Sequence, residues 1–243
     1  MPKLLSMSSI NLGDLLVEVS RKDIKNVHLS VYPPLGAIRV SAPINMELET
    51  IRVFVISKLG WIKQQQKKLN NQQREAPRDF LDRESHYFLG KRYQMRVVES
   101  NNKPKIELSH NYLTLQVRPS TTTEKRQIFL NDWYRAQLKH LIPPLINQYQ
   151  QLINVNVSEF GVKRMKTKWG TCNPTARRIW INLELAKKPP ECLEYIVVHE
   201  MVHLLEPTHN NRFLSLMNLF LPKWRLYKDE LNKLPVRHEN WKY

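Results

Sequence analysis

Three histidines and one glutamate near the carboxyl end of the chain form its most informative chemical pattern. An HExxH motif spans His199–His203, and His209 follows six residues after the second motif histidine. On a helix, positions i and i+4 share one face, so two imidazoles can bind one metal ion. Zinc held by three protein ligands keeps a position for water and lowers the pKa of that water to about 7. The pattern predicts zinc-dependent hydrolysis, with His199, His203 and His209 as ligands and Glu200 as the general base.

The third ligand depends on where the motif helix ends. Two prolines at Pro189–Pro190 precede an apolar run and favour a helix start, while Pro207 predicts an end at about Leu205. A residue six positions beyond the second motif histidine would point about 240° away on a continuous helix, so the break allows His209 to return to the metal. Three acidic residues are alternative third ligands: Glu206, Asp229 and Glu230.

Further motifs surround the metal motif in a characteristic order. They are Lys166–Cys172, Arg178–Leu183, His209–Phe213 and Leu221–Trp224. This order and spacing resemble the YgjP-like metallopeptidases, HExxH zinc proteins of the minigluzincin type that are related to the WLM and SprT-like groups. The resemblance is dense between residues 164 and 231 and looser before them. It implies that His199, His203 and His209 are metal ligands and that Glu200 is the catalytic acidic residue.

The chain departs from the family pattern at two positions. Thr171 stands where the family usually has serine, and Leu214 stands where it usually has tryptophan. Neither position is a proposed ligand, so the expected zinc chemistry is unaffected.

One motif also predicts a strand beside the metal. Apolar and other residues alternate over Arg178–Leu183, which is typical of a half-buried strand. Related metallopeptidases hold an extended peptide against an exposed edge strand through main-chain hydrogen bonds. We expect Arg178, Trp180 and Asn182 to belong to such a substrate edge, although an ordinary sheet member would show the same alternation.

Positive charge is the second informative feature. The chain has 38 Lys and Arg against 22 Asp and Glu, a formal net charge of +16. Basic residues interleaved with Trp169 and Trp180 have the composition of a nucleic-acid groove, but a solvated face has it as well. The candidate contacts are Lys163, Arg164, Lys166, Lys168, Arg177 and Arg178.

Three functions fit these patterns. The leading one is a zinc metallopeptidase acting on a peptide or an unfolded protein chain. One alternative is a metal-dependent nucleoside triphosphate pyrophosphohydrolase, which the positive charge favours and the lack of a glycine-rich phosphate loop disfavours. The other is a nucleic-acid-associated SprT-like protease or binding factor. The sequence leaves the oligomeric state open.

The sequence predicts an α+β fold for the elements that position the motif. We expect a β-rich N-terminal region with one long helix, residues 1–120, packed on a mixed α/β zincin-like catalytic domain, residues 121–243. No internal sequence repeat is evident. The expected elements are strands within Leu15–Ser41 with a turn at Tyr32–Gly36, a helix over Met46–Asn70, a hairpin over Tyr87–Val98, strands at Lys105–Leu108 and Tyr112–Val117, and a helix over Thr123–Leu152 that Pro143 and Pro144 could kink.

Composition predicts the environment of the protein. No run of 18 apolar residues occurs, and the first residues lack a signal-peptide pattern, so we expect a cytoplasmic protein with no membrane partner. Two cysteines are too few for a disulfide framework and are expected to be free thiols. Of these, Cys172 fits a small apolar packing role better than a zinc-ligand role, and Cys192 lies in the apolar run before the motif.

Overall fold

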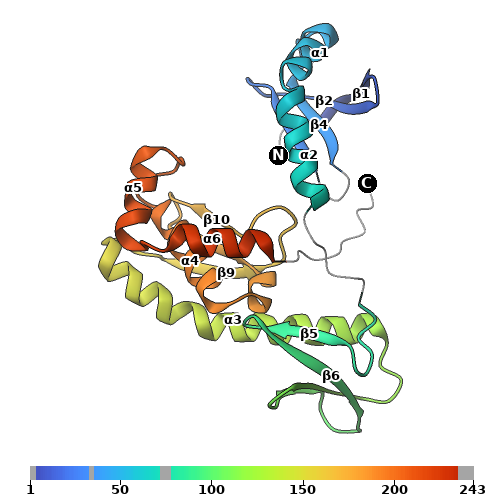
Figure 1. The fold of residues 1–243 in the computed structure, drawn as a ribbon, viewed down its shortest axis with the longest axis vertical. Helices are drawn as coiled ribbons and strands as arrows, with labels where there is room; N and C mark the ends of the chain where they lie inside the picture. The colour runs from blue at the N-terminus through green and yellow to red at the C-terminus, as the bar shows by residue number, and fades with distance from the viewer. Residues whose placement is uncertain (1–3, 33–35, 72–77, 235–243) are drawn as a thin grey trace. The chain divides into compact units, whose positions relative to one another are not determined.

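In the computed structural model the chain folds into two compact units (Figure 1). The first includes the residues up to Ala76, and the second is Pro77–Leu234. The structure describes residues 4–32, 36–71 and 78–234. Strands and helices follow one another in blocks within each unit, which confirms the α+β class. No helix in these ranges combines the length and the apolar character needed to cross a membrane.

The first unit is a four-stranded sheet with two helices. Its elements are β1 (Leu4–Leu12), β2 (Leu15–Lys22), β3 (His28–Tyr32), β4 (Ala37–Pro43), α1 (Leu48–Ser57) and α2 (Leu59–Asn71). The strand order is β1-β2-β4-β3, in which β2 and β4 are parallel and the outer pairs antiparallel. Alternate strand residues pack against Ile51, Val55 and Ile62 of the helices.

Two details of this unit differ from the sequence expectation. Strand β1 pairs along most of β2 and was not predicted. The single helix expected over Met46–Asn70 is divided at Lys58, whose φ of −107° and ψ of 6° end α1. The turn predicted at Tyr32–Gly36 includes residues 33–35, which lie outside the described ranges, but β3 and β4 pair antiparallel as that turn requires.

The second unit begins with another four-stranded sheet. Its strands are β5 (Ser85–Phe88), β6 (Lys91–Glu99), β7 (Lys105–Leu108) and β8 (Tyr112–Val117). The order is β5-β6-β8-β7, again with a parallel central pair, here β6 and β8, and antiparallel outer pairs. All four strands were expected from the sequence, which grouped them with the N-terminal region.

A long helix, α3 (Thr123–Ile153), connects this sheet to the rest of the second unit (Figure 1). The Thr122 side chain caps its first turn, and Asn154 ends it in the left-handed region with a φ of 56°. Its buried residues recur at intervals of three or four positions, which places one apolar stripe along the helix. The helix continues through Pro143 and Pro144 and contacts β7, β8, β9 and α4, so it joins the two parts of the unit.

The remaining elements carry the metal motif. They are β9 (Glu159–Lys163), β10 (Gly170–Asn173), β11 (Arg178–Asn182), the short 3-10 helix η1 (Leu183–Lys187), α4 (Pro190–Val202), α5 (Asn211–Phe220) and α6 (Trp224–Lys233). The three strands form a sheet in the order β10-β11-β9. Helix α4 contacts β10, β11, α3, α5 and α6, so it lies at the centre of this part.

Candidate metal centre

Helix α4 is a buried platform for the motif. It starts with Pro190 in its first turn, and nine of its residues are buried, Glu200 included. The helix ends at Val202, close to the predicted end at Leu205, and His203 is its C-cap. The amides of Leu204 and Leu205 bond to carbonyls three residues back, at 3.0 Å each, which tightens the last turn before Pro207.

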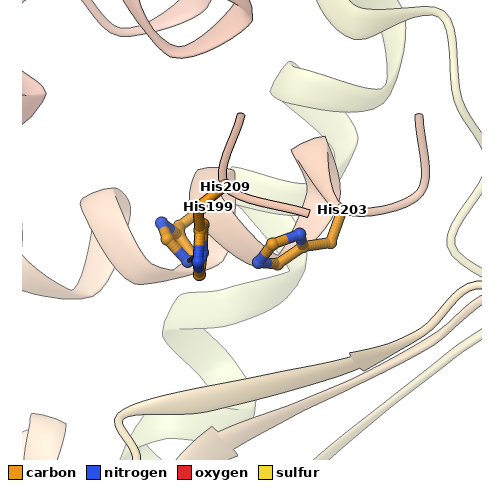
Figure 2. A group of neighbouring side chains, drawn as sticks. All are labelled: His199, His203 and His209. Atoms are coloured by element: carbon orange, nitrogen blue, oxygen red, sulfur yellow. Dashed lines mark hydrogen bonds between the residues drawn. The ribbon is translucent and has the colours of Figure 1, made fainter. Parts of the chain in front are cut away.

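Three imidazoles converge where this helix ends (Figure 2). The ring centroids of His199, His203 and His209 are 4.7 to 4.9 Å apart. Nε2 of His199 lies 3.0 Å from Nε2 of His209. Two ligand nitrogens of a tetrahedral zinc site are about 3.3 Å apart, given Zn–N distances of about 2.0–2.1 Å. Within the described ranges, these residues are the group of His, Cys, Asp and Glu side chains whose donor atoms could hold one ion.

Hydrogen bonding and burial around the three rings suit a metal ligand role. Nδ1 of His203 lies 3.0 Å from the carbonyl oxygen of Glu206. A carbonyl only accepts, so Nδ1 carries a hydrogen and Nε2 is the nitrogen that faces a metal. Burial, aided by the charges of His203, His209 and Lys228, lowers the pKa of His199 to about 3. Burial also lowers the pKa of His209, so both rings are neutral at pH 7 and able to bind a cation.

The segment after α4 returns His209 to the site. Glu206 Oε1 accepts hydrogen bonds from the backbone and hydroxyl of Thr208, at 3.3 and 2.9 Å, and so organises the turn instead of joining the histidine cluster. Asn210 then caps α5 by accepting from the amide of Phe213 at 3.0 Å. The Phe213 ring is 4.7 to 4.9 Å from all three imidazole centroids and forms an apolar wall against them.

The carboxylate of Glu200 is held against the first residue of β10. Glu200 is only 5% exposed. A Cβ on Gly170 would come within 2.5 Å of its Oε1 and 2.7 Å of its Cγ, so only glycine leaves room for the carboxylate here. Burial raises the pKa of Glu200 to about 8, and the positive charge of Lys168 opposes that rise. The close approach to Gly170 cannot be inferred from spacing, since the two residues are thirty positions apart.

A pocket of about 580 Å³ opens at these residues. Its walls include the metal motif, the segment Lys168–Cys172, which leads into β10, and three residues of α6. Cys172 is a free, half-buried thiol whose pKa is raised to about 11 by burial and by the charge of Glu200, so it is a neutral part of the lining. The three α6 residues are Lys228, Leu231 and Asn232, and nothing in the sequence pointed to their place in the pocket.

The predicted substrate strand is not the edge of the sheet. Strand β11 pairs with β10 on one side and β9 on the other, so its main-chain groups are already bonded in both directions. The prediction of an edge at Arg178, Trp180 and Asn182 is therefore wrong, and the edge beside the metal motif is β10. The sequence could not reveal this order, because β10 has four residues, one of them glycine, and no alternation.

Asn182 instead positions the segment that precedes β10. It is buried, and its Nδ2 donates to the carbonyl oxygens of Met165 and Lys168 at 3.1 and 2.8 Å. Its backbone amide donates to the carbonyl of Trp169 at 2.9 Å. The side chain thereby fixes the loop that leads into the pocket wall.

The basic residues that were grouped as nucleic-acid contacts divide among three locations. Trp180 lies across Gly161, with Lys163 Nζ 4.6 Å and Arg178 Cζ 5.7 Å from its ring centroid. Arg178 also pairs with Glu159 at 3.2 Å. Lys168, in contrast, lines the metal pocket. The other three, Arg164, Lys166 and Arg177, lie in the loops that flank β10, and their role as contacts stays a prediction.

Comparison with known proteins identifies the family. The model of the YgjP-like metallopeptidase domain matches residues 25–234. Among solved structures, the metallopeptidase zymogen of Pyrococcus abyssi abylysin has a TM-score of 0.35 and 16% identity, covering 37% of this chain and 90% of that one. No curated protein gives a match. Because the family model covers most of the sequence, the chain belongs to the YgjP-like metallopeptidase family.

Proposed function

We propose that this member of the YgjP-like family is a zinc-dependent peptidase that cleaves extended peptide segments, with Glu200 as its general base. The observation that carries the proposal is the meeting of three imidazoles and a buried carboxylate in one pocket. A zinc ion bound by His199, His203 and His209 would supply a Lewis acid and lower the pKa of water at the site.

The proposed role of Glu200 as general base depends on how its surroundings affect its protonation. In its ionised form the carboxylate accepts a proton from the attacking water and then delivers it to the leaving amine. Burial favours the protonated form of the Glu200 carboxyl group, which exists between the two proton transfers. A nearby cation favours the ionised form, which accepts the proton from water. Lys168 is such a cation, because its charge acts to lower the pKa of Glu200. The bare backbone of Gly170 lets the carboxylate stay at the pocket wall through both transfers.

The edge strand β10 is the proposed substrate platform. It pairs only with β11 among the described strands, so its other side offers unpaired main-chain groups to an extended peptide. Gly170, Thr171 and Cys172 also line the pocket. A peptide added to β10 as a further strand would therefore run past Glu200 and the histidines.

Hydrolysis of a phosphoanhydride is a second candidate, favoured by Lys168 and Lys228 in the pocket lining. Nucleoside triphosphates usually reach enzymes with Mg²⁺, which prefers carboxylate and carbonyl oxygens. In the described part of the chain, the group able to hold an ion is made of imidazoles, which suit zinc better. Peptide hydrolysis is therefore the first choice.

A direct comparison of substrates tests the proposal. The zinc-loaded protein is incubated with casein, with internally quenched peptides and with a panel of nucleoside triphosphates, before and after chelation and after zinc is restored. We expect peptide cleavage that is lost on chelation and regained with zinc. Release of pyrophosphate from nucleotides, with no cleavage of any peptide, would replace the peptidase with the second candidate.

Association with nucleic acid is a separate proposal, favoured by the two cations over the partly exposed ring of Trp180. Replacing Arg177 and Arg178 with alanine should reduce the salt dependence of binding to DNA or RNA by about one to two logarithmic slope units. The slope is measured with single-stranded and duplex oligonucleotides. Equal, shallow slopes for the wild type and the variant would exclude nucleic acid as a partner of this surface.

A further inference from the structure

The formal charges that line the metal pocket are unevenly distributed. Its lining contains three residues with formal charge, Lys168, Glu200 and Lys228. Glu200 is the proposed base, and the other two charged residues are lysines. Among the described residues, no salt bridge includes Lys168 or Lys228. The pocket thus offers two cations that no acidic side chain in the described ranges neutralises through an ion pair.

Lys228 comes to the pocket on a well-defined helix face. It lines the pocket with Leu231 and Asn232, three and four positions further along α6, which is the spacing of one face. Its Nζ lies 5.6 Å from the ring centroid of Trp224, which is buried. Lys228 therefore lines the pocket from a helix face that packs on a buried tryptophan.

Lys168 comes to the pocket from a different element. It lies in the loop before β10, and its carbonyl oxygen accepts a 2.8 Å hydrogen bond from the buried amide of Asn182. This bond fixes the backbone from which the side chain extends. The two lysines therefore approach the site from separate elements with restrained backbones, the β10 loop and α6.

From this arrangement we propose that Lys168 and Lys228 form a subsite for a substrate carboxylate next to the scissile bond, so that the enzyme prefers acidic peptides. The proposal rests on the peptidase function proposed above and names its substrate class. The carboxylate can be an Asp or Glu side chain or the carboxyl terminus of the peptide, since both present the same group. Two ammonium groups attract an anion, and the proposed peptidase function makes a peptide carboxylate its source.

A set of matched peptides tests the subsite. Glu, Gln or Lys is placed at each position flanking the cleaved bond, and each peptide is made with a free and with an amidated carboxyl terminus. The wild type is compared with Lys168→Gln, Lys228→Gln and the double variant, and zinc content is measured for each. Lys233→Gln is the matched control, because Lys233 lies on α6 but does not line the pocket.

The expected result is a kcat/KM about 10-fold higher for the Glu peptide than for the Gln peptide, a ratio that falls towards one in the double variant at unchanged zinc content. Lys228→Glu should shift the preference towards Lys peptides. If the wild type instead prefers the free over the amidated terminus, and the double variant does not, the bound carboxylate is the terminal one. A Glu to Gln ratio and a free to amidated ratio that are both the same in the wild type and the double variant would overturn the subsite.

Binding keeps this test separate from the peptidase proposal. If no peptide is cleaved, the peptidase function fails, and the affinities of the same uncleaved Glu and Gln peptides are measured by fluorescence anisotropy. Tighter binding of the Glu peptide that depends on both lysines supports the subsite. Equal affinity of the two peptides overturns it, as does a lysine-dependent affinity for inorganic triphosphate that exceeds the affinity for the Glu peptide.

Discussion

The two four-stranded sheets have the same topology but lead to different structures. In β1-β2-β4-β3 and in β5-β6-β8-β7, two antiparallel hairpins join through a parallel central pair. Both first hairpins have two-residue turns, after Leu12 and after Phe88. The sequence shows no repeat, so the likeness is one of topology.

The two units differ in the helices that follow each sheet. The first sheet leads into the short helices α1 and α2, which complete a small core. The second leads into the 31-residue α3, whose buried stripe continues into the core around α4. The sheet topology that the two units have in common is therefore a scaffold. The metal motif lies in the segment that follows α3 in the second unit.

The largest expected effect concerns Glu200. Replacement by glutamine keeps the size of the side chain but removes its ability to accept a proton. Glu200→Gln should therefore fold, keep its metal and lose roughly 10²- to 10⁴-fold in kcat. Peptide turnover and zinc content are measured on the same preparation. Full activity in this variant would exclude Glu200 as the base.

A pair of glycines sharpens the comparison between the units. Gly170 in the second unit has no room for a Cβ beside Glu200, whereas Gly60 in α2 of the first unit has nothing within 4 Å of that position. Gly170→Ala should displace the carboxylate and lower kcat by about 10- to 100-fold, with zinc content unchanged. Gly60→Ala should leave kcat unchanged. Similar kinetics for the two variants would show that Gly170 is not needed to position Glu200.

The equivalent hairpin position differs between the two sheets. Counted from the turn, Ile10 of β1 corresponds to His86 of β5, and both are 1% exposed. Burial, with the charges of Arg78 and Lys187, lowers the pKa of His86 to about 3, although the carboxylate of Glu84 lies 3.6 Å from its Nε2. An apolar residue in one sheet thus corresponds to a titratable one in the other.

This difference predicts a pH effect on stability. Between pH 6.5 and about 3 the unfolded chain binds a proton at His86 that the folded chain does not, so stability falls as the pH falls. The loss from this group should be about 2 kcal/mol at pH 5. Urea unfolding at pH 7 and pH 5 is compared for the wild type and His86→Leu. An equal loss in both proteins would assign the pH effect to other groups.

The sequence predicted the local features of the site and missed its long-range ones. The ends of α4 can be predicted from Pro190 and Pro207, because proline limits the backbone wherever it occurs. The order of β9, β10 and β11 depends on pairings between distant segments that a four-residue strand does not encode. The positions of Gly170 and Lys228 at the pocket likewise depend on packing, which a single sequence does not show.

The metal content of the protein tests the three-histidine site most directly. Zinc per chain is measured by mass spectrometry for the wild type, His209→Ala and Glu230→Ala after dialysis against a weak chelator. We predict about one zinc per chain for the wild type and Glu230→Ala, and a large loss for His209→Ala, because three ligands are needed to hold the ion. Full zinc in His209→Ala, together with a loss in Glu230→Ala, would contradict the three-histidine site and assign the third ligand to α6.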